Sequence, residues 1–534
     1  GGAGMTYWRL PMFRTLGLII HIGRFPQIPT FAVMNPFKRL AGQTAIYGIP
    51  SILGRFLNYL LVPLYTYGLL TQGQFGIVNL FYSYTALLMV FLTYGMETAF
   101  FRFSETELDK KSVYSTGLIS LLATTGLFLI FTNLFPKTIA GWLQYPQYPN
   151  FIIWFSWIMA LDVLSAIPFA RLRALNRPIW FSAIKSVNIF TLVLLNLFFL
   201  LLCPYLYDHY RDAWIGTAIG IIYRPGWTIE YIFIANLLAS LVTLILLLPQ
   251  VFNLQWKFDA GLWKRMILYS LPLMIAGMAG IVNETIDRIL LRYLLPGTPA
   301  DAEAQVGIYS ACYKIAVLMV LFIQAYRFAA EPFFFSQMKN RDAKQVYARI
   351  MDYFVIVVST IFLVTMLFLD TVFIRLTGPE FRSARAVIPV LMLAKLFLGI
   401  YFNLSIWYKL TGKTLFGALI TLIGMIITLG LNIYWIPLSP DHLIYGYLGS
   451  AWATMACYSV MMVLAYLIGQ KYYPIPYNLK KFFGYIGLAL LLYAISTLVP
   501  FNRALPGIGF NLLLLAFFAF VVYLFELRVP ARRS

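Results

Sequence analysis

Long apolar runs separated by short polar connections extend over almost the whole chain. A helix needs about 20 residues to cross a hydrocarbon core roughly 30 Å thick, and about fourteen of these runs reach that length. No connection between them is long enough for a soluble domain. The pattern therefore predicts an all-α integral membrane protein. The predicted spans are residues 43–68, 76–100, 113–135, 151–170, 179–203, 230–252, 266–291, 305–335, 350–370, 386–408, 414–435, 443–470, 482–500 and 507–527.

Two parts of the chain repeat the same order of helix-opening motifs. The motif YGIP (47–50) recurs as YSLP (269–272), and FGIVNLFYSYTALLMVF (75–91) recurs as VGIYSACYKIAVLMVLF (306–322). Each copy contains six predicted helices. Because six is even, both copies enter the membrane in the same sense, and an axis along the membrane normal relates them. Two parallel six-helix bundles are therefore expected to face each other across a cavity.

The repeat also sets the predicted domain boundaries. Two helices follow the second copy, and the first four residues, GGAG, resemble a cloning scar. The predicted segments are a cytoplasmic N-terminal segment (1–42), an N-terminal six-helix bundle (43–252), a cytoplasmic linker (253–265), a C-terminal six-helix bundle (266–470), and helices 13 and 14 with a cytoplasmic tail (471–534).

Composition and charge agree with a bilayer as the solvent. Of the 534 residues, 61% are hydrophobic and 11% are charged, which is far from the balance of a soluble domain. The net charge is +20, a value that also suits a nucleic-acid-binding protein. With a cytoplasmic N-terminus, however, 26 of the 40 Lys and Arg residues fall on the cytoplasmic side, 8 on the other side and 6 inside spans. This positive-inside asymmetry predicts cytoplasmic termini and no nucleic-acid partner.

The first two predicted helices carry a family resemblance. The run GRFLNYLLVPLYTYGLLTQGQFGIVNLFYSYTALLMVF (54–91) resembles the start of the polysaccharide-export, Wzx-like flippases of the multidrug/oligosaccharidyl-lipid/polysaccharide superfamily. The layout of twice six helices plus two also fits, and the resemblance covers about residues 40–530. It implies a V-shaped transporter in the bacterial inner membrane. Such a protein flips an undecaprenyl-diphosphate-linked oligosaccharide, a repeat unit of O-antigen, capsule or exopolysaccharide, by alternating access.

The ionisable residues inside the predicted spans are functional candidates, because a charge at bilayer depth is costly unless it meets a partner or a cavity. Arg55 lies in the middle of the first span with Asn58 on the same helix face. Its guanidinium could donate two parallel hydrogen bonds to the substrate diphosphate. Alternatively, Arg55 forms a salt bridge with Asp162 inside the N-terminal bundle.

The seventh predicted span gathers Asn283, Glu284, Asp287 and Arg288 within an arc of about 140°. Two interpretations stay open for this face. Glu284 and Arg288 are four positions apart with the acid first, the favoured order for an internal pair. Alternatively, the face lines the cavity. Glu284 or Asp287 would then take a coupling proton or cation, and Arg288 would contact phosphate.

Three cations on later helices complete the set. Lys314 either partners Asp287 or presents its ammonium to the cavity. Lys395 has no acid in its own helix, which favours a role between the bundles. Arg327 and Glu331 are four positions apart, so an internal pair is expected.

On this hypothesis each site residue has a predicted role. Arg55, Lys314, Lys395 and Arg288 bind the diphosphate. Glu284, Asp287 or Asp162 takes the coupling H⁺ or Na⁺, the only cofactor expected. Asn58, Asn283 and Gln324 line the cavity as neutral polar groups. The expected partners are the polyprenyl-diphosphate-linked glycan and membrane lipids, with a polysaccharide polymerase or glycosyltransferases as candidates, and the protein is expected to be a monomer.

Enzyme chemistry finds little support in the motifs. Gly412-Lys413-Thr414 ends like a phosphate-binding loop, but Trp407 stands where the first glycine is required. The three cysteines and three histidines are scattered, without metal-ligand or disulfide spacing. The alternatives are a lipid II flippase of the MurJ type, a drug/cation antiporter, and a membrane polysaccharide polymerase or ligase.

Overall fold

The structure is a computed structural model of the chain. It describes residues 54, 56–57, 59–210, 212–252, 255–338, 340–499 and 505–528. Within these ranges every regular element is a helix, and 13 helices are long and apolar enough to cross a membrane. The chain is therefore a multi-pass membrane protein, as its hydrophobic pattern predicts.

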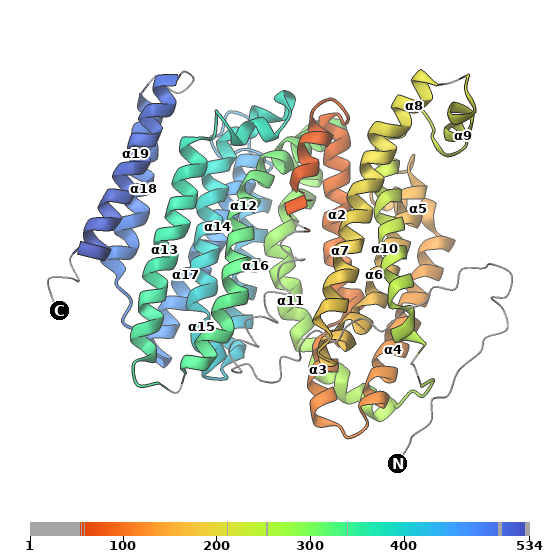
Figure 1. The fold of residues 1–534 in the computed structure, drawn as a ribbon, viewed down its shortest axis with the longest axis horizontal. Helices are drawn as coiled ribbons and strands as arrows, with labels where there is room; N and C mark the ends of the chain where they lie inside the picture. Colours follow the sequence, from red (N-terminus) through yellow and green to blue (C-terminus); the bar gives the residue numbers. More distant parts are fainter. Residues whose placement is uncertain are drawn as a thin grey trace, which may run out of the picture.

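The helices form two groups that stand side by side (Figure 1). The N-terminal group starts with the helical residues 59–66. It consists of α2 (Gln72–Thr93), α3 (Met96–Thr106), α4 (Lys110–Leu134), α5 (Pro136–Trp142), α6 (Pro149–Ala174), α7 (Pro178–Leu197) with its π-helical continuation η3 (Phe198–Leu202), α8 (Cys203–His209), α9 (Trp214–Ile222) and α10 (Ile229–Val251).

The C-terminal group begins after the long helix α11 (Ala260–Leu294), which runs between the two groups (Figure 1). This group consists of α12 (Pro299–Gln337), α13 (Ala343–Leu367), the short 3₁₀ helices η4 (Phe373–Leu376) and η5 (Pro379–Ala386), α14 (Val387–Leu404), α15 (Ile406–Leu410), α16 (Thr414–Trp435), α17 (Tyr447–Tyr472), α18 (Leu479–Leu498), and α19 (Leu505–Tyr523) with η6 (Leu524–Arg528).

Thirteen of the fourteen predicted spans correspond to helices of the structure, and the span predicted at 414–435 matches the bounds of α16. The remaining one, 43–68, lies mostly outside the described residues. The helices α11 and α12 are longer than predicted, with 35 and 39 residues. The predicted domain boundaries stay a prediction.

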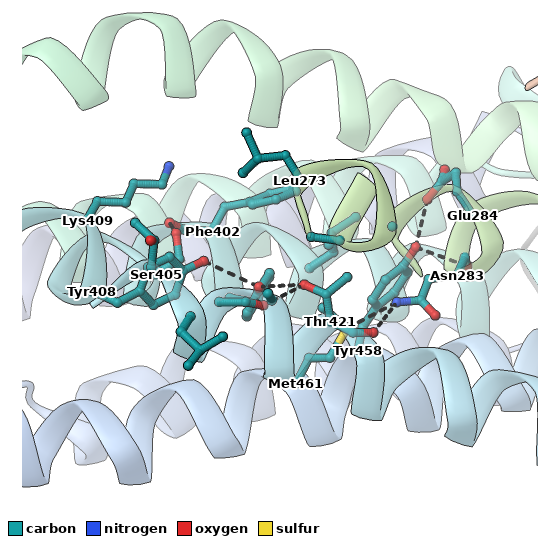
Figure 2. A pocket seen from close by; sticks show the side chains of 18 of the residues that line it. Leu273, Asn283, Glu284, Phe402, Ser405, Tyr408, Lys409, Thr421, Tyr458 and Met461 are labelled. Carbon is teal, nitrogen blue, oxygen red and sulfur yellow. Dashed lines mark hydrogen bonds between the residues drawn. The ribbon is translucent and has the colours of Figure 1, made fainter. Parts of the chain in front are cut away.

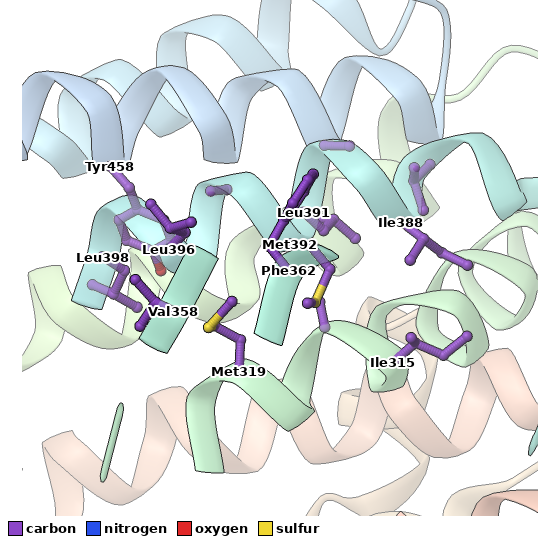
Figure 3. Close-up of a cluster of buried hydrophobic side chains, with 14 of the residues drawn as sticks. Ile315, Met319, Val358, Phe362, Ile388, Leu391, Met392, Leu396, Leu398 and Tyr458 are labelled. Atoms are coloured by element: carbon purple, nitrogen blue, oxygen red, sulfur yellow. The ribbon is translucent and has the colours of Figure 1, made fainter. Parts of the chain in front are cut away.

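A large apolar core holds the C-terminal group together. Figure 3 shows side chains of α12, α13 and α14 pointing toward one another, among them Met319, Phe362 and Leu391. All three are less than 2% exposed. In the bilayer such packing gains mainly dispersion energy, since lipid tails are as apolar as these side chains. The group therefore forms a rigid frame for the polar residues between its helices.

Helix α11 belongs to both groups. Leu262 and Met266, near its start, lie in an apolar cluster with α3, α4 and α6, whereas Leu291, near its end, lies in the core of the C-terminal group. Pro272 interrupts the helix between these two parts and removes one backbone hydrogen bond there. The second half of α11 is thus fixed to the C-terminal group, and this half carries the predicted polar face.

Helices α2 and α12 begin in the same way and then cross closely. Each opens with a capping box, in which Thr71 pairs with Gln74 and Thr298 with Asp301. Past the caps, Gly76 and Gly307 face each other. A Cβ on Gly76 would overlap the carbonyl oxygen of Glu303, so the two backbones come closer than any side chain allows. This crossing joins the two groups at the end that carries residues 67–71.

Further contacts close the molecule at this same end, here called the closed end. The amide of Gly378 donates to the Thr66 hydroxyl at 2.9 Å, and Arg382 donates to the Tyr67 hydroxyl at 2.9 Å. Arg292 is only 4% exposed and bridges Glu303 and Tyr145 at 3.2 Å each. Burial raises the pKa of Tyr145, so its hydroxyl stays protonated and Glu303 supplies the negative charge.

Candidate functional site

A cavity of about 550 Å³ lies between α11 and the helices α14 to α17; it is called the C cavity below. Figure 2 shows Asn283 and Glu284 at one end of it and Tyr408 and Lys409 at the other. The polar side chains that line it are Asn283, Glu284, Arg327, Tyr401, Ser405, Tyr408, Lys409, Thr414, Thr421 and Tyr458.

Glu284 lies at the deep end of the C cavity and is fully engaged. Its two carboxylate oxygens accept hydrogen bonds from Lys395 Nζ at 2.7 and 2.8 Å. The hydroxyls of Tyr313 and Tyr458 donate to the same oxygens at 2.8 and 2.7 Å. Four helices, α11, α12, α14 and α17, supply these groups. The Lys395 side chain is 0% exposed and that of Glu284 is 36% exposed. An ion pair with a buried member is tolerated when additional hydrogen bonds satisfy its charges, and both tyrosines serve that purpose.

Lys395 corrects one expectation. The lack of an acid in its own helix indicates a role between the bundles, yet its side chain is 0% exposed and its partner Glu284 belongs to the same group. Its ammonium also lies over the rings of Tyr313 and Tyr458, at 4.9 and 5.0 Å from their centroids. Sequence distance hides this pair, because the two residues are 111 positions apart.

Asp287 and Arg288 form a second pair beside the first. Arg288 Nη1 lies 3.0 Å from Asp287 Oδ1 and donates to the backbone carbonyl of Glu284 at 2.9 Å. The Tyr309 hydroxyl donates to the other oxygen of Asp287 at 2.7 Å. The internal pair expected between Glu284 and Arg288 is therefore wrong, since each side chain has a different ionic partner.

The other end of the C cavity carries excess positive charge. Arg327 Nη2 and Lys409 Nζ lie 3.4 and 2.6 Å from the same Glu331 oxygen. The expected pair between Arg327 and Glu331 is thus confirmed, but Lys409 makes it a triad of two cations and one carboxylate. Both cations line the cavity, and the Arg327 guanidinium lies 4.0 Å from the centroid of the Phe402 ring. This end can receive an anion.

The other residues predicted for the site, Asn283, Gln324 and Asp162, do not lie together. Asn283 lines the C cavity and donates to the Thr421 carbonyl at 3.2 Å, while its Oδ1 has no partner among the described residues. Gln324 lines neither cavity described here. Asp162 is half-buried on α6, in the other group, with Ser240 and Lys185 as polar neighbours. Arg55 and Asn58 lie outside the described residues.

A second cavity, of about 340 Å³, lies in the N-terminal group between residues 61–65, α2, α7 and α10; it is called the N cavity below. Lys314 of α12 is the charged residue in its lining. Lys314 thus lines a cavity and forms no salt bridge with Asp287, which pairs with Arg288; its role in binding a substrate stays a prediction. The neutral polar lining consists of Tyr65, Asn79, Tyr82, Asn188, Asn196 and Asn236.

Sequence reasoning missed two parts of these cavities. Lys409 follows directly after a predicted span and was assigned to a loop. The asparagines of the N cavity were not predicted, because neutral carboxamides do not stand out in apolar helices as ionisable residues do. Their spacing offered a signal, since Asn188 and Asn196 are eight positions apart and therefore share one face of a helix.

The chain matches one protein family over much of its length. Residues 40–339, more than half of the sequence, match the family described as polysaccharide biosynthesis protein. The chain belongs to this family. No curated protein sequence matches this polysaccharide biosynthesis protein.

Solved structures show which fold the family member adopts. It is similar to lipid II flippase MurJ in an inward closed conformation, with a TM-score of 0.66 over 89% of this chain and 98% of that one at 13% identity. It is also similar to an inward-facing multidrug resistance MATE transporter, with a TM-score of 0.56 over 83% and 96% of the two chains at 13% identity. The predicted MATE/MurJ-like fold is confirmed.

Proposed function

We propose that this polysaccharide biosynthesis protein is a flippase that moves a polyprenyl-diphosphate-linked oligosaccharide across the bacterial inner membrane. The substrate would enter from the cytoplasm, where both termini lie on this proposal. The two helix groups then rock against each other and expose the cavities alternately to the two sides. The family, the fold and the polar cavities inside an apolar protein support this function.

The observation that carries the proposal is the triad at the end of the C cavity. Arg327 and Lys409 share the single carboxylate of Glu331, so one positive charge is left over at a position that lines the cavity. Both phosphates of a diphosphate diester are ionised and need donors when they leave water. A guanidinium and an ammonium side by side supply such donors through charge-assisted hydrogen bonds.

The remainder of the C cavity suits the sugar next to the diphosphate. Tyr401, Tyr408, Ser405 and Thr421 present hydroxyls along its lining, and hydroxyls can both donate to and accept from a sugar. Apolar residues such as Leu273 and Met461 fill the space between them (Figure 2). The cavity thus combines an anion site with a lining for a polyhydroxyl ring.

The pair of Glu284 and Lys395 is our candidate for coupling. An entering proton or Na⁺ can occupy Glu284 only by displacing the Lys395 ammonium from both carboxylate oxygens. Such a displacement would change the balance between conformations if it is easier in one of them. On this proposal Lys395 and Arg288 neutralise Glu284 and Asp287. The diphosphate binding that was predicted for Lys395 and Arg288 is carried out by Arg327 and Lys409 instead.

Export in cells tests the function. Arg327→Gln and Lys409→Gln are compared with Lys413→Gln, a matched control at the same end whose side chain lies over the Tyr472 ring and outside the cavity lining. We expect both cavity variants, at normal abundance, to lose surface polysaccharide and to accumulate lipid-linked repeat units, whereas the control exports normally.

Three outcomes, one from these variants and two from removal of the whole protein, would contradict the proposal. Normal export in both cavity variants would remove the triad from the transport path. Unchanged glycans after deletion of the whole gene would refute polysaccharide export itself, and a loss of viability on depletion, with all other glycans intact, would point instead to lipid II as the substrate.

A further inference from the structure

The N cavity presents hydrogen-bond acceptors that the protein leaves unused. Asn79 donates its amide group to the Phe75 carbonyl at 2.8 Å, and Asn188 donates to the Ala239 carbonyl at 3.1 Å. A backbone carbonyl can only accept, so these contacts fix which side of each carboxamide is nitrogen. Both Oδ1 atoms are thereby directed away from these anchors and accept no hydrogen bond from the described residues.

A third carboxamide and a phenol extend this lining. Asn236 of α10 donates to the Tyr82 hydroxyl at 3.1 Å, which leaves the Tyr82 proton free to be donated to a ligand. Asn196, in contrast, is satisfied within the protein, because Tyr65 donates to it at 2.8 Å. The cavity therefore offers acceptors on α2, α7 and α10, together with neutral donors that include the Tyr82 hydroxyl.

Lys314 adds a cation that the protein does not neutralise. All 20 acidic residues of the chain lie within the described ranges, and none of them forms a salt bridge with Lys314. Arg288, Arg327 and Lys395 each have a carboxylate. Lys314 thus differs from these three, and its ammonium is available to an anionic ligand.

The lining excludes two simple occupants. A diphosphate has oxygen acceptors only and would place them against the carboxamide oxygens of Asn79 and Asn188, which have nothing to donate. A metal cation would suit those oxygens, but the Lys314 ammonium already supplies the positive charge and would repel it. The ligand must instead donate to several acceptors and carry one negative charge.

We propose that the N cavity binds an acidic sugar unit, a pyranose ring with a single carboxylate. The carboxylate would pair with Lys314 while ring hydroxyls donate to Asn79, Asn188 and Asn236 and accept from Tyr82. A volume of about 340 Å³ falls within the range of small-molecule sites. This inference rests on the proposed function and specifies it further: the transported glycan contains a uronic-acid-like residue.

The position of the site gives it a further role. Lys314 belongs to α12 of the C-terminal group, whereas the carboxamides belong to helices of the N-terminal group. A bound acidic sugar would therefore bridge the two groups near the crossing of Gly76 and Gly307. It would bias their relative position, which is how a substrate can favour one conformation of a transporter.

Ligand-induced thermal stabilisation of the purified full-length protein tests the site. The probes are methyl β-glucuronide, methyl β-glucoside and sodium acetate at matched ionic strength. We expect the glucuronide to raise the unfolding temperature at lower concentration than the glucoside, and acetate to have no effect. In Lys314→Gln the apparent affinity for the glucuronide should fall roughly tenfold or more, to that of the glucoside, because one charge-assisted contact is lost.

Two further variants show whether a lost response reflects the binding site or a misfolded protein. Lys314→Arg keeps the positive charge and should keep the preference for the glucuronide, whereas Asn188→Leu should weaken both sugars. Equal responses to glucuronide and glucoside in the wild type would overturn the proposal, as would an undiminished glucuronide response in Lys314→Gln. These unfolding temperatures do not depend on export. A failure of the flippase hypothesis would be seen separately, as normal polysaccharide export in cells that carry Arg327→Gln or Lys409→Gln.

Discussion

Gly76 and Gly307 occupy equivalent positions of the sequence repeat and lie against each other in the structure. A Cβ added to Gly76 would lie 3.1 Å from the amide nitrogen of Gly307, and a Cβ on Gly307 would lie 3.0 Å from the amide nitrogen of Gly76. The near equality of the two distances shows that each glycine approaches the backbone of the other helix in the same way. The groups meet here through backbone, with no side chain between them.

Enlarging either glycine should force α2 and α12 apart. Each added methyl group also overlaps a carbonyl oxygen, that of Glu303 or that of Gln72, and overpacking of this kind costs about 1–3 kcal/mol. We expect Gly76→Ala and Gly307→Ala to lower the unfolding temperature measured in detergent. Gly73→Ala is the control, because the nearest atom to its Cβ would be 3.9 Å away. Equal stability of all three variants would show that the crossing is not tightly packed.

The repeat illustrates what the sequence could predict. The motifs around Gly76 and Gly307 predicted two helices that begin alike, and α2 and α12 each open with a capping box, because helix-opening residues are local properties. They did not predict that the two glycines touch, since the contact depends on how the two groups pack. The same limit explains why the sequence offers Arg288, a neighbour of Glu284 in sequence, as its possible ionic partner and does not point to Lys395 on another helix.

Other site residues escaped prediction for different reasons. Lys409 is placed at the C cavity by the short helix α15, which breaks from α14 at Ser405, a detail that a hydropathy profile does not contain. The carboxamides of the N cavity are neutral and therefore do not stand out among apolar neighbours. Charge inside an apolar span does mark Arg288, Lys314 and Lys395 in the sequence, and the structure shows that Arg288 and Lys395 are paired with carboxylates, whereas Lys314 forms no salt bridge with the described residues.

Removing one charge of the Glu284–Lys395 pair should lower the stability of the protein, and removing both charges should restore most of it. Lys395→Met leaves the Glu284 carboxylate, whose side chain is 36% exposed, without its cation, so the loss should be smaller than the about 3–5 kcal/mol that breaking a fully buried pair costs. The double variant Glu284→Gln, Lys395→Met removes both charges and should recover most of the stability. Thermal unfolding in detergent compares the wild type with Glu284→Gln, Lys395→Met and the double variant. Additive losses in the double variant would mean that the two residues do not act as a pair.

Arg292 should hold the closed end shut. Replacing it by Gln removes the ionic contact with Glu303 and weakens the link to Tyr145, so the two groups should separate there more often. A reporter is Ala311→Cys, placed in a protein whose native cysteines are replaced by alanine. Ala311 is 0% exposed and packs against the apolar cluster of the N-terminal group. We expect a maleimide to label this cysteine faster in the Arg292→Gln background.

Two further cysteines calibrate the labelling. Trp214→Cys lies at a position that is 79% exposed and should react at the same rate in both backgrounds. Ala394→Cys lies inside the core of the C-terminal group at 0% exposure and should react in neither. If Arg292→Gln accelerated the Ala394→Cys reaction as much as the Ala311→Cys reaction, the variant would be unfolding the protein, and the role of Arg292 at the closed end would be refuted.

The most direct measurement is transbilayer movement in proteoliposomes. A polyprenyl-diphosphate-linked oligosaccharide is placed in both leaflets, and a glycosidase added outside removes the glycan that it can reach. We predict that wild-type protein makes almost all of the glycan accessible, while Arg327→Gln, Lys409→Gln and protein-free vesicles stop near one half. Lys413→Gln should match the wild type. A wild-type protein that stops at one half, or cavity variants that flip as fast as Lys413→Gln, would contradict the account.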